Sequence, residues 1–432
     1  MKRFLWLSAL VTVLAAGPVL AQAVAPRPEE GTSAPAPKSA EPGTFGAQPV
    51  ATTAVAADPG APPAPAPGLQ IRSTQDMQAW LDHGLARWAF GPFDIALHSR
   101  VQMMGGWVGK DSLLSEGDKM QHPGFRLRRV RVGLEGHLYT TVSYLVELDI
   151  VDSEQSGGPL HEAWVDWTPC HWFGVTAGFQ KFLLVRTMMD SSAQLAHVDR
   201  ALGATAMSPE ESLGVSIHSE PWKDHLTLSF GVFNAGERVS GFFQGWQPAG
   251  VTLGNRFENL AYSGRVDLVP LGPIGRGEPD LWKEHSFRLA LGGGGYYNDG
   301  GSTTSKGWSA YVAMKAWGFH LLAEGIMDWA SPKAAALTTN TINSKTRRAV
   351  AHATVGYMIL RDLLGIAARV EWLNDNLALT SNQDETLVYA GTLSYYAIGH
   401  FLKAQVEYQH RQELHGAGLK NDSALVGLQA YF

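Results

Sequence analysis

Residues 142–150 read Val-Ser-Tyr-Leu-Val-Glu-Leu-Asp-Ile. Every residue at an even position is apolar, whereas Ser143, Glu147 and Asp149 lie at odd positions. Residues 402–409, Leu-Lys-Ala-Gln-Val-Glu-Tyr-Gln, repeat this alternation near the end of the chain. Because successive side chains of a β-strand point to opposite faces, both stretches predict strands with one apolar and one polar face.

Sixteen such segments follow one another from residue 93 to residue 432. Each is long enough for the roughly 9–11 residues that a tilted strand needs to cross a bilayer. The connections between them alternate between long and short, with 181–211 the longest and 270–283 an exception of intermediate length. Long loops at one end and tight turns at the other are typical of outer-membrane barrels. We therefore predict an all-β fold, a 16-stranded antiparallel transmembrane β-barrel over residues 93–432 with short periplasmic turns and long extracellular loops.

Three segments precede the predicted barrel. Residues 1–23 combine a basic start, an apolar run and Ala-Gln-Ala, which predicts an export signal peptide. Residues 24–68 hold 11 of the 23 prolines and 12 alanines, so we expect a disordered Pro/Ala-rich periplasmic tether. Residues 69–92 are expected to be a short helical lead-in, because Met77, Trp80, Leu81 and Leu85 follow helical spacing. No segment after the signal approaches the roughly 18 apolar residues of a transmembrane helix.

The overall composition excludes several classes of protein. The 432 residues include 34 basic and 40 acidic side chains, a net charge of −6, and one cysteine. A disulfide scaffold and a nucleic-acid-binding protein are therefore not expected. The 15 histidines are scattered without an HExxH motif, and no GxSxG motif occurs, so we expect no metal, no cofactor and no enzymatic activity.

If the apolar row of each strand faces lipid, the opposite row faces the inside of the barrel, and its charged residues are predicted to line a pore. The basic ones are Arg129, Arg131, Arg265, Arg288, Lys315, Arg348, Arg369 and Lys403, and the acidic ones include Glu135, Glu147, Asp149, Glu162 and Asp166. Basic rings inside a channel favour anions. The alternative is that these charges pair across strands and only stiffen the wall.

The alternation slips between residues 125 and 132. Phe125 and Leu127 are odd-numbered apolar residues, whereas Val130 and Val132 are even-numbered. One extra residue in the strand would reconcile the two halves, so we predict a β-bulge near Arg128.

Residues 125–136, Phe-Arg-Leu-Arg-Arg-Val-Arg-Val-Gly-Leu-Glu-Gly, resemble an early strand of the phosphate-selective porin O/P family. Residues 144–149, 162–167 and 178–182 resemble successive elements of that family, although Phe182 replaces its usual proline. The resemblance implies an outer-membrane porin, a homotrimer, with the loop 181–211 folded into the lumen as a constriction. Lys181, Arg186 and Arg200 would then stand at the constriction.

These patterns together predict a protein of the Gram-negative outer membrane, surrounded by lipid, with its tether in the periplasm. The function we expect is passive diffusion of small anions such as phosphate through a charged lumen. One alternative is a general non-selective or cation-tolerant porin. From other classes, a barrel enzyme or a structural cell-wall anchor remains open.

Overall fold

The chain was analysed as a computed structural model, which describes residues 86–109, 123–151, 159–238, 246–248, 259–275, 277–283, 286–333, 342–378, 385–415 and 418–431. The predicted signal peptide, the tether and the lead-in up to residue 85 lie outside the described residues, as does the terminal Phe432. No helix within the described part of the chain is long and apolar enough to span a membrane.

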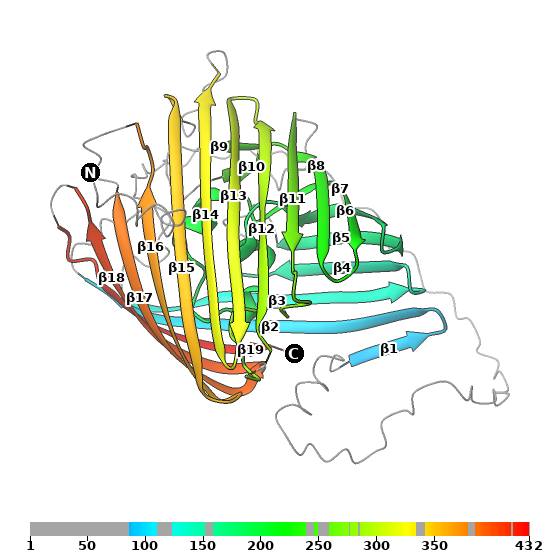
Figure 1. Cartoon of the computed structure of the whole chain (residues 1–432), viewed down its shortest axis with the longest axis horizontal. Coiled ribbons are helices and arrows are strands. Elements are labelled where there is room, and N and C mark those ends of the chain that lie inside the picture. The colour runs from blue at the N-terminus through cyan, green and yellow to red at the C-terminus, as the bar shows by residue number, and fades with distance from the viewer. Residues whose placement is uncertain are drawn as a thin grey trace, which may run out of the picture. The chain divides into compact units, whose positions relative to one another are not determined.

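Sixteen strands form a closed antiparallel barrel, as predicted (Figure 1). They are β2 (Phe93–Val108), β3 (Gly124–Leu138), β4 (Val142–Asp149), β5 (Leu160–Cys170), β6 (Phe173–Lys181), β7 (Glu211–Trp222), β8 (Leu226–Asn234), β11 (Leu260–Leu268), β12 (Arg288–Asp299), β13 (Thr303–Ala316), β14 (Phe319–Pro332), β15 (Thr346–Leu360), β16 (Leu364–Asn374), β17 (Thr386–His400), β18 (Leu402–Glu413) and β19 (Ser423–Tyr431). Each strand pairs with the next, and β19 pairs with β2, with Tyr431 opposite Arg100. Each strand therefore has a hydrogen-bonded neighbour on both sides, as a bilayer requires.

The two ends of the barrel differ in their connections. At the turn end, neighbouring strands join through very short segments, for example Trp317-Gly318, whose φ angles are 54° and 91°. Positive φ at two successive residues is the conformation that a tight hairpin turn needs. At the loop end the connections are longer. The alternation of connection lengths is therefore explained by two unlike ends of one barrel.

The barrel wall has an apolar outside and a polar inside. Val146 is 45% exposed and Leu148 is 39% exposed, whereas Glu147 between them is 5% exposed. The same alternation repeats around the barrel, with Trp107, Trp172, Trp222 and Trp317 among the exposed aromatic residues near strand ends. Exposed apolar strands flanked by aromatic residues form the surface that meets lipid.

The prediction of a helical lead-in over residues 69–92 is wrong for residues 86–90, the part of it that forms a regular element in the structure. Residues Ala86–Phe90 form strand β1, which pairs antiparallel with Phe93–Leu97 of β2. The described pairing of β19 with β2 ends at Tyr431 opposite Arg100, so the start of β2 extends beyond it. The backbone N–H and C=O groups at the start of β2 need hydrogen-bond partners, and β1 supplies them. Pairing with β2 therefore decides the conformation of residues 86–90, although apolar residues before them follow helical spacing.

Candidate functional site

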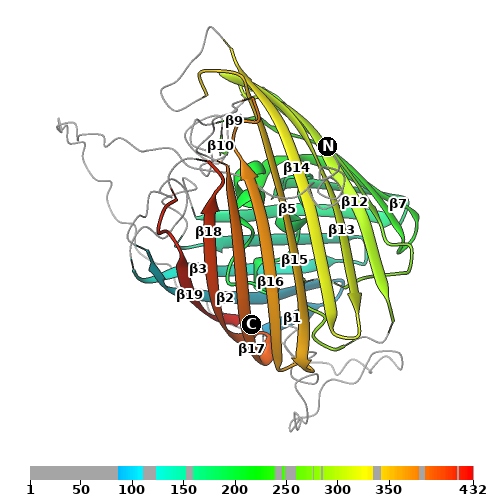
Figure 2. The ribbon, with the colours of Figure 1, turned by 60° about the vertical axis from the view of Figure 1, so that its left-hand side comes forward.

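The segment between β6 and β7, residues 182–210, is called the lumen loop here because it lies inside the barrel (Figure 2). It contains α3 (Arg186–Met189), the 3-10 turn η1 (Ser192–Gln194) and α4 (Leu202–Met207). Leu184, Val185 and Ala204 are 0% exposed. They share one apolar cluster with inward side chains of five strands, namely Phe233, Ile326, Val350, Leu373 and Val388. A substantial part of the lumen is therefore packed rather than open.

Carboxylates of the wall bind backbone N–H groups of the lumen loop. Glu324 of β14 accepts hydrogen bonds from the Thr187 backbone N–H at 3.0 Å and the Thr187 hydroxyl at 2.8 Å, and also from the Arg186 N–H. Glu407 of β18 accepts from the Val198 N–H at 2.9 Å. These N–H groups lie at the start of a short helix or in irregular backbone, where no acceptor within the loop is available. The carboxylates of the barrel wall therefore serve as their hydrogen-bond acceptors.

Three of the predicted pore-lining cations donate hydrogen bonds to carbonyl groups of the lumen loop. Arg265 Nη1 donates to Leu184 O at 2.9 Å, Lys403 Nζ to Leu195 O at 3.0 Å, and Arg369 Nη1 to Asp199 O at 2.9 Å. Arg265, Arg369 and Lys403 are 5%, 4% and 4% exposed. The structure thus gives these side chains an anchoring contact that the strand pattern alone did not indicate.

The β3 bulge lies where the sequence predicts it. Arg129 pairs with Gln102, but the next pair along is Leu127 with Met103, so Arg128 is the extra residue. Arg128 and Arg129 are consequently both buried on the inner side, 6% and 1% exposed. Both bind Asp199 of the lumen loop, Arg128 Nε at 2.5 Å and Arg129 Nη2 at 3.1 Å. β-Bulges, which change the direction in which a side chain points, are common next to functional sites.

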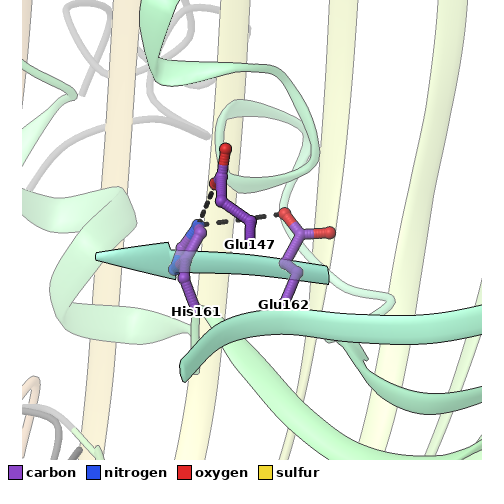
Figure 3. A group of neighbouring side chains, drawn as sticks. All are labelled: Glu147, His161 and Glu162. Atoms are coloured by element: carbon purple, nitrogen blue, oxygen red, sulfur yellow. Dashed lines mark ion pairs between the residues drawn. The ribbon is translucent and has the colours of Figure 1, made fainter. Parts of the chain in front are cut away.

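A second bulge on β5 has the same effect and was not predicted. Glu147 pairs with Glu162, whereas Leu148 pairs with Leu160, which leaves His161 as the extra residue. His161 and Glu162 are both buried at 9% exposure, and Figure 3 shows them grouped with Glu147 of β4. Arg131 joins this group through Asp149, which lies 2.7 Å from its Nε, and through Glu147 at 3.3 Å. The slip of alternation at residues 160–162 is the sequence signal for this bulge.

The other predicted residues also lie on the inner face, but in different surroundings. Arg288 and Lys315 are half-buried opposite each other at the turn end, and Arg348 is 1% exposed. Glu135 is exposed and shares its face with its partner Ala96. Asp166 is half-buried and accepts from the Thr176 hydroxyl at 2.7 Å. Their role as pore-lining charges stays a prediction.

The three residues expected at a constriction all contact the lumen loop. Lys181 Nζ donates to Met189 O at 3.0 Å, and Arg200 Nε donates to Thr187 O at 3.0 Å. Arg186 Nε lies 2.9 Å from Asp190 Oδ2. Of the three, Lys181 and Arg186 keep 22% and 17% of their side chains exposed, so they remain accessible to a solute.

Two charged groups of the lumen loop are kept ionised by their neighbours. Burial alone would raise the pKa of Glu210, but the positive charges of Arg200 and Arg129 outweigh burial and lower it. Burial alone would lower the pKa of Arg186, but the neighbouring Asp190 raises it instead. Both side chains therefore carry fixed charges at neutral pH.

Sequence reasoning missed a second inward segment, the hairpin of β9 (Gly236–Arg238) and β10 (Trp246–Pro248). Arg238 is 0% exposed, and its Nε donates to Asp328 Oδ2 of β14 at 2.8 Å. Its Nη1 donates to Ala206 O at 3.0 Å, and its guanidinium lies over the Trp246 ring. This hairpin thus fastens the α4 end of the lumen loop.

Two further wall residues, Arg100 and Gln102, were also missed. Arg100 Nη1 donates to Ser192 Oγ at 2.9 Å, and Gln102 Nε2 donates to Ser192 O at 3.1 Å. Both occupy the inner row of the strand that the alternation predicts at residues 93–104. Their position on this inner row was the sequence signal that could have identified them.

The turn 270–283 also reaches the lumen loop. The Glu278 N–H donates to Gln194 O at 2.9 Å, and Glu278 Oε2 accepts from the Ala196 N–H at 2.8 Å. A small pocket remains between this turn, the lumen loop and β13–β14, and its lining includes Arg186, Asp190, Glu278 and Lys315.

We expect Glu324→Ala to loosen the lumen loop. The substitution leaves the buried Thr187 N–H and hydroxyl without this acceptor, which costs about 1–3 kcal/mol. Equilibrium unfolding in detergent measures the loss, with Glu220→Ala at the half-buried turn end of β7 as the control. Equal free energies of unfolding for the two variants would show that this carboxylate does not hold the loop.

The fold is shared with bacterial proteins of known structure. The match to outer-membrane expressed OmpT of Vibrio cholerae covers 80% of this chain and 100% of the other, with 10% identity and a TM-score of 0.52. The outer membrane channel DcaP of Acinetobacter baumannii matches at 14% identity and a TM-score of 0.51, covering 81% of this chain and all of the other. Salmonella typhi OmpF, solved with daunomycin, matches at 11% identity and a TM-score of 0.50 over 80% of this chain. These similarities concern the fold alone.

A closed barrel with an apolar outside and a charged lumen that holds an inward loop is the architecture of an outer-membrane channel. The resemblance to a particular family is confirmed, because the family model described as phosphate-selective porin O and P matches residues 108–256. That range contains β3 to β8 and the whole lumen loop. No curated protein matches the chain in sequence.

Proposed function

We propose that the chain is a passive diffusion channel for small hydrophilic solutes, with only a weak preference for ions of either sign. The observation that carries the proposal is the lumen loop, which is hydrogen-bonded to inward side chains around the barrel. A loop held this way narrows the lumen permanently, so passage needs neither a moving gate nor an energy source. The porin relatives support a channel rather than an enzyme or a wall anchor.

The weak preference for anions or cations follows from the exposure of the charged side chains in the lumen, because only exposed charges can contact a passing solute. Arg129, Arg131, Arg265, Arg348, Arg369 and Lys403 are between 1% and 5% exposed. Carboxylates compensate four of these cations, and loop carbonyls accept hydrogen bonds from three, namely Arg265, Arg369 and Lys403. Asp199 pairs with Arg128 and Arg129, and Asp267 pairs with Arg265, but these two carboxylates keep 24% and 25% of their side chains exposed, comparable to Lys181 at 22%. Accessible charges of both signs give a channel little reason to exclude either kind of ion.

A preference for small anions such as phosphate is the second proposal. The matched family is described as phosphate-selective, and the half-buried Arg186, Lys315 and Arg288 supply accessible positive charge. On the same family grounds we propose a homotrimer. We also propose that residues 1–23 are removed on export and that the tether 24–68 lies in the periplasm.

Ion selectivity separates the two proposals. Across a tenfold KCl gradient an ideally selective channel reverses at roughly 59 mV of either sign, and we expect the purified channel to reverse close to zero. Asp267→Asn should move the reversal potential toward the anion-selective limit, because Asp267 is accessible. Arg129→Ala should move it less, since Arg129 is 1% exposed. A potential near the anion limit would contradict weak selectivity and support the phosphate proposal.

A further inference from the structure

The loop ends of β4, β5 and β7 bring one imidazole nitrogen and three carboxylates together. His161 Nε2 lies 3.6 Å from Glu147 Oε1, 3.8 Å from Glu162 Oε1 and 3.5 Å from Glu211 Oε1. Figure 3 shows the contacts to Glu147 and Glu162. The four side chains are between 7% and 12% exposed. This group, called the His161 cluster, adjoins the base of the lumen loop.

Local backbone geometry places the His161 cluster. The β5 bulge turns His161 to the same side as Glu162, and Glu147 lies directly opposite Glu162 on β4. Glu211 is the first residue of β7, and its backbone partner is Lys181, the last residue of β6. Without the bulge His161 would point to lipid, where an imidazole is unfavourable. The extra residue therefore adds a nitrogen donor to a group of oxygen donors.

The carboxylate of Glu211 has the His161 imidazole at ion-pair distance, 3.5 Å from its Oε1. Its side chain is 9% exposed, and it accepts no hydrogen bond from the described residues. A buried carboxylate in this state is costly unless a proton or a cation neutralises it. Its oxygen points to His161 Nε2, the atom that Glu147 and Glu162 also approach.

Carboxylates outnumber the cations that are in direct contact with the His161 cluster. The carboxylates that face it are Glu147, Asp149, Glu162, Glu210 and Glu211. Arg131 and Lys181 contact them, His98 Nε2 lies 3.0 Å from Glu147 Oε2, and the charge of Arg100 also acts on Glu147. Arg200 and Arg129 act on Glu210 from the side of the lumen loop. Arg131 and Lys181 alone therefore do not balance the acids that converge here.

The spacing of the cluster matches the spacing around a bound metal ion. Ligand atoms around a four-coordinate divalent metal with bonds of about 2.1 Å lie roughly 3.4 Å apart, close to the 3.5–3.8 Å separations from His161 Nε2. The ligand atoms of Glu147, His161 and Glu162 all lie within 4.8 Å of one another, as do those of His161, Glu210 and Glu211. We propose that the His161 cluster binds a divalent transition-metal ion such as Zn²⁺, Co²⁺ or Mn²⁺, with the imidazole and two of the surrounding carboxylates as ligands.

Arg131 competes with such an ion. Its Nη1 lies 2.5 Å from His161 Nε2, and its Nε lies 2.7 Å from Asp149 Oδ2. Metal binding requires Nη1 to withdraw from His161, while the bond to Asp149 can hold the rest of the guanidinium in place. The bound ion would join β4, β5 and β7 and stiffen the base of the lumen loop. This role is independent of the channel function proposed above.

Titration with Co²⁺ tests the site, because low-coordinate Co²⁺ ligated by nitrogen and oxygen absorbs visible light. The untagged, folded chain in detergent is expected to bind one Co²⁺, which Zn²⁺ displaces. His161→Ala and Glu211→Gln should each weaken binding at least tenfold. Arg131→Met should strengthen binding about tenfold, because the competing guanidinium is gone. His137→Ala, an exposed histidine beside Asp94, is the matched control and should bind like the parent.

Two results would overturn the proposal. One is the absence of a Co²⁺ spectrum in both the parent and Arg131→Met, which would make Arg131 the only cation of the cluster. The other is binding that His161→Ala leaves unchanged, which would place the ion elsewhere. Heat-dependent mobility of the barrel in gels verifies that each variant is folded. If Arg131→Met does not fold, the parent, His161→Ala and Glu211→Gln still decide the outcome.

Discussion

Replacing residues 186–206 by a short Gly-Ser linker is expected to raise single-channel conductance several-fold. The removed segment carries α3, η1 and α4, whose side chains pack against the inner wall. Removing them opens cross-section to water and ions without changing the sixteen-stranded ring. Recording in planar bilayers measures the effect, and Tyr139→Asn at the opposite, turn end is the control, because its φ of 55° suits asparagine.

Unchanged conductance in the folded deletion variant would mean that the lumen loop does not set the narrowest passage. If that variant does not fold, a milder change keeps the test available. Glu324→Ala combined with Glu407→Ala removes two anchors of the loop while leaving the loop itself in place. A freed loop should make the open current noisy, whereas a steady current identical to the parent would contradict the anchoring role.

Arg238→Met is expected to destabilise the barrel by about 3–5 kcal/mol, because it leaves Asp328 buried without its closest cation. Both side chains of this pair are 0% exposed. Asp328→Asn should cost a similar amount, and Arg238→Met/Asp328→Asn should cost clearly less than the sum, since the uncompensated charge is then gone. Denaturant unfolding followed by tryptophan fluorescence supplies the three free energies.

The control for this cycle is the exposed pair of Arg87 and Asp94, whose contact is 3.7 Å. Exposed ion pairs contribute little, so Arg87→Met should change stability by less than about 1 kcal/mol. A small loss for Arg238→Met, or an additive double variant, would show that the β9–β10 hairpin is not held by this ion pair.

The barrel was predictable because alternation acts locally. Each strand must present apolar residues to lipid at every second position. A short stretch such as 142–150 therefore indicates both that it is a strand and which of its side chains face lipid. The bulge at Arg128 was predictable for the same reason, since an extra residue reverses the parity of the apolar row. Both inferences need only neighbours in sequence.

The contents of the lumen were not predictable in the same way. Alternation shows that Glu324 faces inward, but its partner Thr187 is 137 residues away in sequence. A charged residue on the inner row can meet water, another strand or the lumen loop, and its own surroundings in sequence do not distinguish these cases. The predicted pore cations Arg265, Arg369 and Lys403 therefore lie on the expected face but bind loop carbonyls there.

The protein is expected to enclose a water-filled passage, which the fixed lumen loop narrows. Single-channel recording of the mature chain, inserted in a planar bilayer after its folding has been verified, tests it without any substitution. We predict small, discrete conductance steps that stay open steadily and scale linearly with voltage. Folded, inserted protein that produces no steps would contradict the claim.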